Sequence, residues 1–227
     1  MIGLSLQPTQ GASDLAKGIL IAAFDYSSAH ADEFHDWYDL EHLPERQAVS
    51  GFGACRRWLT QKDEAVATYD LETVEVLDNP PYRAIAHDNL SVWSKRVIGQ
   101  CQRLLRFEGT LMGDAVSAAA PDSAGGLLVN AMNIAPEHDA DFNAWYDEEH
   151  LPALKAVPGT LSAHRYLGRE GSTHRYVALY YLERPDIARS QAWKDAASSP
   201  WSDRVVPNFL DRVRILAGAY ARGDTVA

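Results

Sequence analysis

The chain has 227 residues, of which 46% are hydrophobic and 23% charged, and its formal net charge at pH 7 is −10. This composition is typical of a folded globular protein and argues against a disordered chain. The excess of carboxylates argues against a nucleic-acid or anionic-membrane surface, which would require clustered Lys and Arg. No apolar run approaches the ~20 residues of a membrane helix, so we expect a cytoplasmic protein with a small-molecule partner.

The first elements can be predicted in chain order. Residues 1–17 mix polar and small side chains without periodicity and are expected to form a leader. The apolar run at 18–25 predicts a buried strand. A helix should follow, since acidic residues open it and its aromatic residues are spaced three and four apart. We expect this helix to end at Leu43, before Pro44.

The remaining elements complete one unit and then repeat it. After a turn at Gly51 we expect strands at 54–60 and 67–76, a helical region from Pro80-Pro81 through residue 94, and a strand at 103–112. A small-residue linker at 117–125 follows. The second half should contain strands at 126–133, 162–167, 174–182 and 213–220, a helix ending at Leu151 before Pro152, and a helical region from Pro185 that is kinked or split at Ser198-Ser199-Pro200.

An internal duplication underlies this repetition. Residues 34–57 and 142–165 are identical at 12 of 24 positions, with a constant offset of 108 (142 − 34). The chain therefore divides into units at 18–116 and 126–227, each with the βαββαβ order of a ferredoxin-like fold. One such unit leaves a sheet face uncovered. We therefore predict an α+β protein in which the two antiparallel sheets pack into one intramolecular α/β barrel.

The repeated motif WYDxEHLP, followed by a Val-Ser-Gly or Val-Pro-Gly turn, is carried by Trp37, Tyr38, His42 and Pro44, and by Trp145, Tyr146, His150 and Pro152. With the βαββαβ order, it resembles the EthD-like branch of the dimeric α/β-barrel superfamily across both halves. The resemblance implies a pocket at the barrel centre. It also implies cofactor-independent dehydration, decarboxylation, isomerisation or oxygenation of aromatic, polyketide-like or small hydrophobic compounds, while other relatives bind haem.

The repeated histidines are the main catalytic candidates. His42 and His150 can donate and accept a proton near neutral pH, as dehydration or isomerisation requires. Tyr38 and Tyr146 lie one turn earlier on the same helix face, so a Tyr–His pair could act on one carbonyl or hydroxyl group. The structural alternative is that each His bonds backbone carbonyls at the helix end and each Tyr packs in the core.

A second set of candidates lies on the strands. Alternate strand positions combine aromatic, basic and amide side chains, a composition suited to a lined cavity. The two halves differ at these positions, as an asymmetric ligand would require, although drift after duplication is an alternative. The substrate-binding candidates are His164, Asn130, Arg56, Trp58 and Tyr166.

Charged residues also recur in both halves. An Arg on an otherwise apolar strand face needs a carboxylate partner, so we expect Arg57 and Arg165 to clamp the strand to the preceding helix. The partners available there are Asp39, Glu41, Asp147 and Glu149. The alternative, carboxylates paired for acid/base work, is disfavoured because the adjacent Arg would keep them ionised.

The sequence contains no His or Cys residues at the spacing typical of metal ligands, so we expect no metal and no cofactor. Cys55 and Cys101 are expected to be buried free thiols. The leading hypothesis is a cofactor-independent lyase or isomerase that acts on a small hydrophobic or aromatic carbonyl or phenolic compound. The alternatives are a haem-dependent or oxygen-using protein, with His164 or His87 as axial ligand, and a non-catalytic binding module. Whether the fused chain forms a homodimer stays open.

Overall fold

The computed structural model describes residues 16–221, so most of the expected leader lies outside the described residues. The strands close into one barrel in the order β1-β3-β2-β8-β5-β7-β6-β4, in which every pairing is antiparallel. The predicted α+β barrel is therefore confirmed. The strands are β1 (Gly18–Asp25), β2 (Phe52–Leu59), β3 (Glu64–Leu71), β4 (Gln102–Leu111), β5 (Gly126–Ile134), β6 (Thr160–Gly168), β7 (Tyr176–Leu182) and β8 (Phe209–Ala219).

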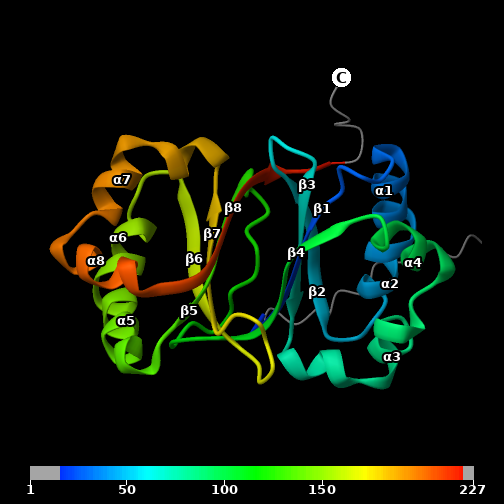
Figure 1. Ribbon diagram of the computed structural model, residues 1–227, viewed down its shortest axis with the longest axis horizontal. Coiled ribbons are helices and arrows are strands. Elements are labelled where there is room, and N and C mark those ends of the chain that lie inside the picture. Colours follow the sequence, from blue (N-terminus) through cyan, green and yellow to red (C-terminus); the bar gives the residue numbers. More distant parts are fainter. Residues whose placement is uncertain (1–15, 222–227) are drawn as a thin grey trace, which may run out of the picture.

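The helices cover the outer faces of the barrel, those of the first unit on one side and those of the second unit on the other (Figure 1). In the first unit they are α1 (Ala31–Trp37), η1 (Tyr38–His42), α2 (Leu43–Gln47), η2 (Val74–Asp78), α3 (Pro80–Arg83), η3 (His87–Asn89) and α4 (Val92–Ile98). In the second they are η4 (Pro136–His138), α5 (Asp139–Trp145), η5 (Tyr146–His150), α6 (Leu151–Lys155), η6 (Pro185–Arg189), α7 (Gln191–Ala197), α8 (Pro200–Val205) and η7 (Val206–Asn208). Between residues 16 and 221, no helix is long and apolar enough to cross a membrane.

The helix that carries the WYDxEHLP signature motif in each unit, here called the signature helix, does not end before its proline, contrary to prediction. The Trp, Tyr and His of the motif are called the signature residues. Its last five residues form a π-helical turn in both units, in which the Leu43 N–H donates to the Tyr38 carbonyl and the Leu151 N–H to the Tyr146 carbonyl. A new α-helical turn then begins, and the proline occupies its first turn, where the missing N–H costs nothing. The π turn thereby carries the helix past the proline and holds His42 or His150 at its end.

Two other element predictions need correction, and one is confirmed. The expected strand at 67–76 ends at Leu71, and a 3-10 turn follows from Val74. The helical region expected from Pro80 is broken into α3, η3 and α4. In the second unit the split at Ser198-Ser199-Pro200 is confirmed, because the Ser199 side chain accepts from the Ser202 N–H and so caps α8.

The barrel interior is filled by side chains. Nineteen buried residues form one cluster there, and three of them, Ala118, Ala120 and Ala124, come from the linker between the units. Figure 1 shows this segment, between β4 and β5, passing through the middle of the molecule. The pocket expected at the barrel centre is therefore a wrong prediction. The small residues of the linker are used for packing where larger ones would not fit.

Polar contacts hold the linker inside the barrel. The Ala120 N–H donates to Asp70 Oδ2 at 3.0 Å, and Arg56 donates from Nη1 to the Pro121 carbonyl at 2.9 Å. Arg56 Nη2 also lies 2.7 Å from Asp122 Oδ1. Asp70 is only 3% exposed, and burial raises the pKa of its carboxyl to about 6.

Candidate functional site

The predicted Arg–carboxylate clamp is present in both units. Arg57 donates to Asp39 Oδ1 at 2.8 Å, and Arg165 donates to Asp147 Oδ1 at 2.7 Å. Each guanidinium also lies 4.5 Å from the ring centre of the preceding signature tyrosine. The clamps fix the signature helix to the sheet, which is a structural role.

The tryptophan and glutamate that occur in both repeats are also structural. Trp37 Nε1 donates to Ser94 Oγ at 2.9 Å, which joins the signature helix to α4. Glu41 accepts hydrogen bonds from the side chains of Ser91 and Ser94. The equivalent contacts in the second unit run from Trp145 to Ser202 and from Ser199 to Glu149.

Both signature histidines sit at the end of a π turn with the ring packed on the signature tryptophan. The ring centres are 4.4 Å apart for His42 and Trp37, and 4.0 Å apart for His150 and Trp145. Burial, assisted by Arg46, lowers the pKa of His42 well below its ordinary value. Burial and Arg212 lower the pKa of His150 to about 4. Both imidazoles are therefore neutral at pH 7.

In both signature histidines, the burial of one ring nitrogen indicates which of the two nitrogens carries the proton. Nδ1 of His42 and Nδ1 of His150 are buried without a hydrogen-bond partner, so neither makes the backbone contact of the structural alternative. A buried N–H without an acceptor is rarer in proteins than an unused acceptor. The proton of the neutral ring therefore belongs on Nε2, and Nε2–H is the group each histidine can offer to a ligand.

The signature tyrosines lie behind the histidines. Tyr38 and Tyr146 are each 1% exposed, and their rings pack edge-on against His42 and His150 at 5.2 and 5.3 Å. Burial raises the pKa of each hydroxyl to about 12. Neither tyrosine lines a pocket that its histidine lines. The geometry therefore favours the packing interpretation of both residues.

A pocket of about 600 Å³ lies in the second unit, between the outer sheet face and helices α7 and α8. His150 lines it, next to the buried ring of Trp193. The other apolar lining residues are Leu128, Leu154, Ala188, Ala197, Val206 and Pro207. The site thus lies between sheet and helices, outside the barrel interior.

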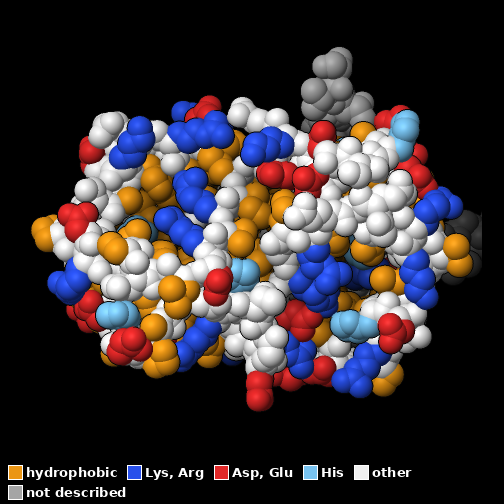
Figure 2. Space-filling model, in the orientation of Figure 1, with side chains coloured by type: hydrophobic (Ala, Val, Ile, Leu, Met, Phe, Trp, Pro, Cys, Tyr) orange, Lys and Arg blue, Asp and Glu red, His pale blue; other side chains and the backbone are white. Residues whose placement is uncertain are grey.

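The polar wall of this pocket comes from two adjacent strands. Asn130 on β5 faces Arg214 on β8 in the strand register, and Arg212 lies two residues earlier on the same strand. Lys194 also lines the pocket, whereas Asp203 is its only acidic lining residue. Figure 2 shows Lys and Arg side chains beside apolar surface in this half of the molecule. The pocket is cationic, although the protein as a whole is acidic.

Asn130 lies on the helix-covered face of β5, whereas the sequence pattern predicted it on the face that lines a central cavity. It shares a strand face with Leu128 and Met132, which pack against the helices, whereas its neighbours Val129 and Ala131 point into the barrel. The prediction that it lines one cavity with the other strand candidates is wrong. Asn130 is 6% exposed, and its Oδ1 is buried without a partner in the pocket wall.

The other strand candidates lie on the barrel-facing side. Trp58 and Tyr166 are each 1% exposed within the interior cluster. Trp58 Nε1 donates to Thr68 Oγ1 at 3.0 Å, and Arg56 binds the linker. His164 is half-buried on the face of β6 that also carries Tyr166. These four residues do not meet His150 or His42 in a described pocket.

The first unit has a much smaller pocket at the equivalent place, about 170 Å³, lined by His42. Arg46, which stands where the second unit has Leu154, lies against it and donates to the carbonyls of His42 and Ile85, both at 3.2 Å. This charged side chain occupies space that is open in the second unit.

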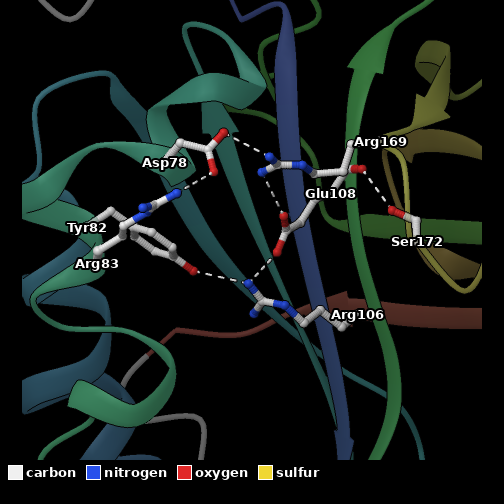
Figure 3. A network of polar contacts seen from close by, with 7 residues as sticks. All are labelled: Asp78, Tyr82, Arg83, Arg106, Glu108, Arg169 and Ser172. Atoms are coloured by element: carbon white, nitrogen blue, oxygen red, sulfur yellow. Dashed lines mark hydrogen bonds and ion pairs between the residues drawn. The ribbon is translucent and has the colours of Figure 1, made fainter.

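A larger groove of about 880 Å³ adjoins the first-unit pocket. Figure 3 shows the ion-pair network in its wall. Arg106 pairs with Glu108 and donates to the Tyr82 hydroxyl at 3.2 Å, while Arg169 reaches Asp78 at 2.8 Å and Glu108 at 3.2 Å. The network joins the first unit to the loop before β7. Its arginines are already neutralised, so they are poorly suited to bind a ligand.

The histidines suggested as haem ligands do not fit that role. His87 does line the groove of about 880 Å³ and the small first-unit pocket, but from an exposed 3-10 turn, and His164 lies apart from the described pockets. His150 does line a sizeable pocket, but a metal-bound histidine normally donates its second ring nitrogen to an acceptor, and Nδ1 of His150 has none. Within residues 16–221, no three His, Cys, Asp or Glu side chains gather as a metal site. Cys55 and Cys101 are free, as predicted, but only half-buried.

Comparison with known proteins identifies the fold. No protein-family description and no curated protein matches the sequence. Among solved structures, an anthrone oxidase-like protein is 11% identical, with a TM-score of 0.59 and coverage of 90% of this chain and 92% of that chain. A variant of the chlorite dismutase of Candidatus Nitrospira defluvii is 13% identical (TM-score 0.57; coverage 91% and 92%). A candidate monooxygenase from Fusobacterium nucleatum is 12% identical (TM-score 0.52; coverage 91% and 94%). The chain thus has the fold of dimeric α+β barrel proteins.

Sequence reasoning missed the two arginines of β8. The segment at 213–220 was predicted only as a closing strand, with no functional role. The sequence did contain a signal for a functional role of Arg214. The first unit has Arg106 and, two residues later, Glu108, whereas the second unit has Arg214 and Leu216 at the same strand positions. The second arginine lacks the acidic residue that neutralises the first.

Proposed function

We propose that this chain is an EthD-like enzyme that transfers protons on a small aromatic carbonyl or phenolic compound without a cofactor, in lyase or isomerase chemistry. The working site is the second-unit pocket. The observation that carries the proposal is a neutral His150 held by the π turn at the wall of a pocket of about 600 Å³. Unusual helical turns of this kind often occur at functional sites.

In this proposal the neutral His150 acts as a hydrogen-bond donor toward oxygen. Its Nε2–H donates to the substrate carbonyl, where negative charge develops when the neighbouring C–H bond loses its proton. The positive potential of the pocket, to which Lys194 and the two arginines of β8 contribute, stabilises the resulting enolate or phenolate. The carbon-bound proton passes to water at the exposed mouth of the pocket. Return of a proton to another carbon isomerises the substrate, and loss of hydroxide from the neighbouring carbon dehydrates it.

Cofactor-independent oxygenation is the second candidate. Two of the similar structures are described as anthrone oxidase-like and as a monooxygenase. An enolate or phenolate formed in the His150 pocket is electron-rich enough to react with O₂, so the same first step serves both reactions. The two candidates differ only in whether oxygen is consumed.

Anthrone is a suitable probe because its CH₂ group is flanked by two aromatic rings and is acidified by conjugation through them to the ketone across the central ring. The test measures deuterium uptake at that carbon by NMR in D₂O without oxygen, for anthrone and for anthrone-2-carboxylate. We expect the protein to accelerate exchange, and His150→Gln to lower the acceleration by about 10²-fold or more. His42→Gln is the matched control and should keep it. Exchange that is unaffected in a folded His150→Gln protein would contradict the proposal.

Oxygen uptake in air separates the two candidates. Consumption of O₂ that depends on His150 favours oxygenation, whereas exchange without O₂ uptake beyond the uncatalysed rate favours lyase or isomerase chemistry. If the protein accelerates neither reaction on either probe, the enzyme proposal is contradicted and the non-catalytic binding module is favoured.

A further inference from the structure

The second-unit pocket contains two arginines without acidic partners among the described residues, although Arg212 lies over the Phe209 ring. Arg212 and Arg214 form no ion pair with any carboxylate among residues 16–221, although most arginines of the described chain do. They stand two residues apart on β8, on the same strand face, and both line the pocket. Each guanidinium adds to the positive potential around the other, which is unfavourable without an anion.

A second, independent feature of the same wall points to a ligand. Asn130 is more than nine-tenths buried, lines the pocket directly opposite Arg214 in the strand register, and has no hydrogen-bond partner for Oδ1. A buried carbonyl oxygen without a donor destabilises the folded protein. The first unit has Ala22 at this position, so the polar group is specific to the larger pocket.

From these features we infer that the ligand of the His150 pocket is an aromatic carboxylate that also carries a hydroxyl group. The carboxylate lies between Arg212 and Arg214, the hydroxyl forms a hydrogen bond with the side-chain amide of Asn130, and the ring lies against Trp193 and Leu128. Arginine is the residue best suited to bind a planar carboxylate by paired hydrogen bonds. The inference deepens the proposed function, since it names the substrate class of that site.

The surrounding charges favour a single anion. Lys194 adds a third positive group to the pocket lining, against the one carboxylate of Asp203. Trp193 is 5% exposed and provides a flat apolar surface for a ring. A hydrophobic neutral ligand would leave both guanidinium groups and the Asn130 oxygen unpaired, and would therefore bind less well.

The test uses isothermal titration calorimetry with three naphthalene probes. 4-Hydroxy-2-naphthoate carries both groups, 2-naphthoate lacks the hydroxyl, and 4-hydroxy-2-naphthamide lacks the charge. We expect the hydroxynaphthoate to bind best, the naphthoate about 5–10-fold more weakly, and the amide at least about 30-fold more weakly. Equal affinity of the amide and the carboxylate, or no binding of any probe at millimolar concentration, would overturn the inference.

Substitutions in the pocket test which residues bind the carboxylate and which binds the hydroxyl group. The double variant Arg212→Gln/Arg214→Gln should lose at least about 30-fold in affinity for the hydroxynaphthoate. The control Arg103→Gln, at the first-unit pocket, should lose none. Asn130→Ala should remove the preference for the hydroxyl while keeping binding of 2-naphthoate. An unchanged affinity in a folded double variant would overturn the assignment.

Two further measurements distinguish this inference from its alternatives. His150→Gln should keep carboxylate binding while it loses exchange on the anthrone probes, so failure of catalysis and failure of anion recognition are seen separately. Inorganic phosphate should compete poorly with the hydroxynaphthoate, because it lacks the ring. Equal competition by phosphate would overturn the aromatic carboxylate in favour of a simple anion site.

Discussion

The two pockets are built on the same backbone and differ in how their charges are paired. In the first unit Arg106 stands opposite Ala22 and is neutralised by Glu108; in the second Arg214 stands opposite Asn130 and has Leu216 in place of the glutamate. The pocket volumes are about 170 and 600 Å³. A duplicated unit has thus kept its fold in both copies, while one copy pairs Arg106 with a carboxylate and the other leaves the equivalent Arg214 without one.

This contrast separates structural from functional repetition. The clamps, the Trp–Ser contacts and the π turns occur twice because each unit needs them to place its helix on the sheet. The residues that differ include several that line the pockets: Arg46 against Leu154, and Ala22 against Asn130. Repetition therefore identifies the scaffold of the site, and divergence identifies the site itself.

The largest expected difference between the units concerns the clamps. Asp39 has a side chain only 14% exposed, whereas that of Asp147 is 62% exposed. We expect Asp39→Asn to lower the free energy of unfolding by about 2–4 kcal/mol, because it leaves the buried Arg57 charge unpaired. Asp147→Asn should cost less than about 1 kcal/mol, since that pair is screened by water. Urea unfolding measures both, and equal losses would show that the two clamps are equivalent.

Much of the scaffold was predictable from the sequence, for physical reasons. Strand β1 and the clamps follow from apolar periodicity and from the need of a buried Arg for a carboxylate. The filled interior was not predictable, because a linker of Ala, Ser and Gly gives no periodic signal that it lies in a core. The site prediction placed Asn130 on the wrong strand face because polarity was used to assign faces, and a helix-covered pocket can also contain polar residues.

The next prediction converts one pocket toward the other. Leu216→Glu places a carboxylate near Arg214, as Glu108 lies near Arg106, and should lower the affinity for 4-hydroxy-2-naphthoate by about 10-fold. Leu216→Gln is the control, because it has a similar shape without the charge and should bind nearly as well as the parent. Calorimetric titration of both variants measures the effect. If both lose affinity equally, shape rather than charge pairing distinguishes the two pockets.

The histidine of the open pocket should also be visible in the pH dependence of stability. Its pKa is lowered to about 4 in the folded protein by burial and by Arg212, so the unfolded chain binds more protons between pH 4 and 6.5. Stability should therefore fall as pH falls through this window. His150→Gln should remove about 1–2 kcal/mol of the loss between pH 6.5 and 5. Urea unfolding at several pH values measures this slope, and an unchanged slope would mean that His150 is solvated.

The smallest expected effect on stability comes from a substitution in the barrel interior. Both units form this interior, so the substitution should not alter the difference between the two pockets. Burial raises the pKa of Asp70 to about 6, so the folded protein binds a proton there more strongly than the unfolded chain, and stability falls as pH rises from about 4 to 7. Asp70→Asn keeps an oxygen that can accept from the Ala120 N–H without the buried charge. We expect this variant to be about 1 kcal/mol more stable than the parent at pH 7 and equal at pH 4, with unchanged naphthoate binding. If it were less stable at every pH, the carboxylate charge itself, balanced by Arg56, would be what holds the linker in the barrel.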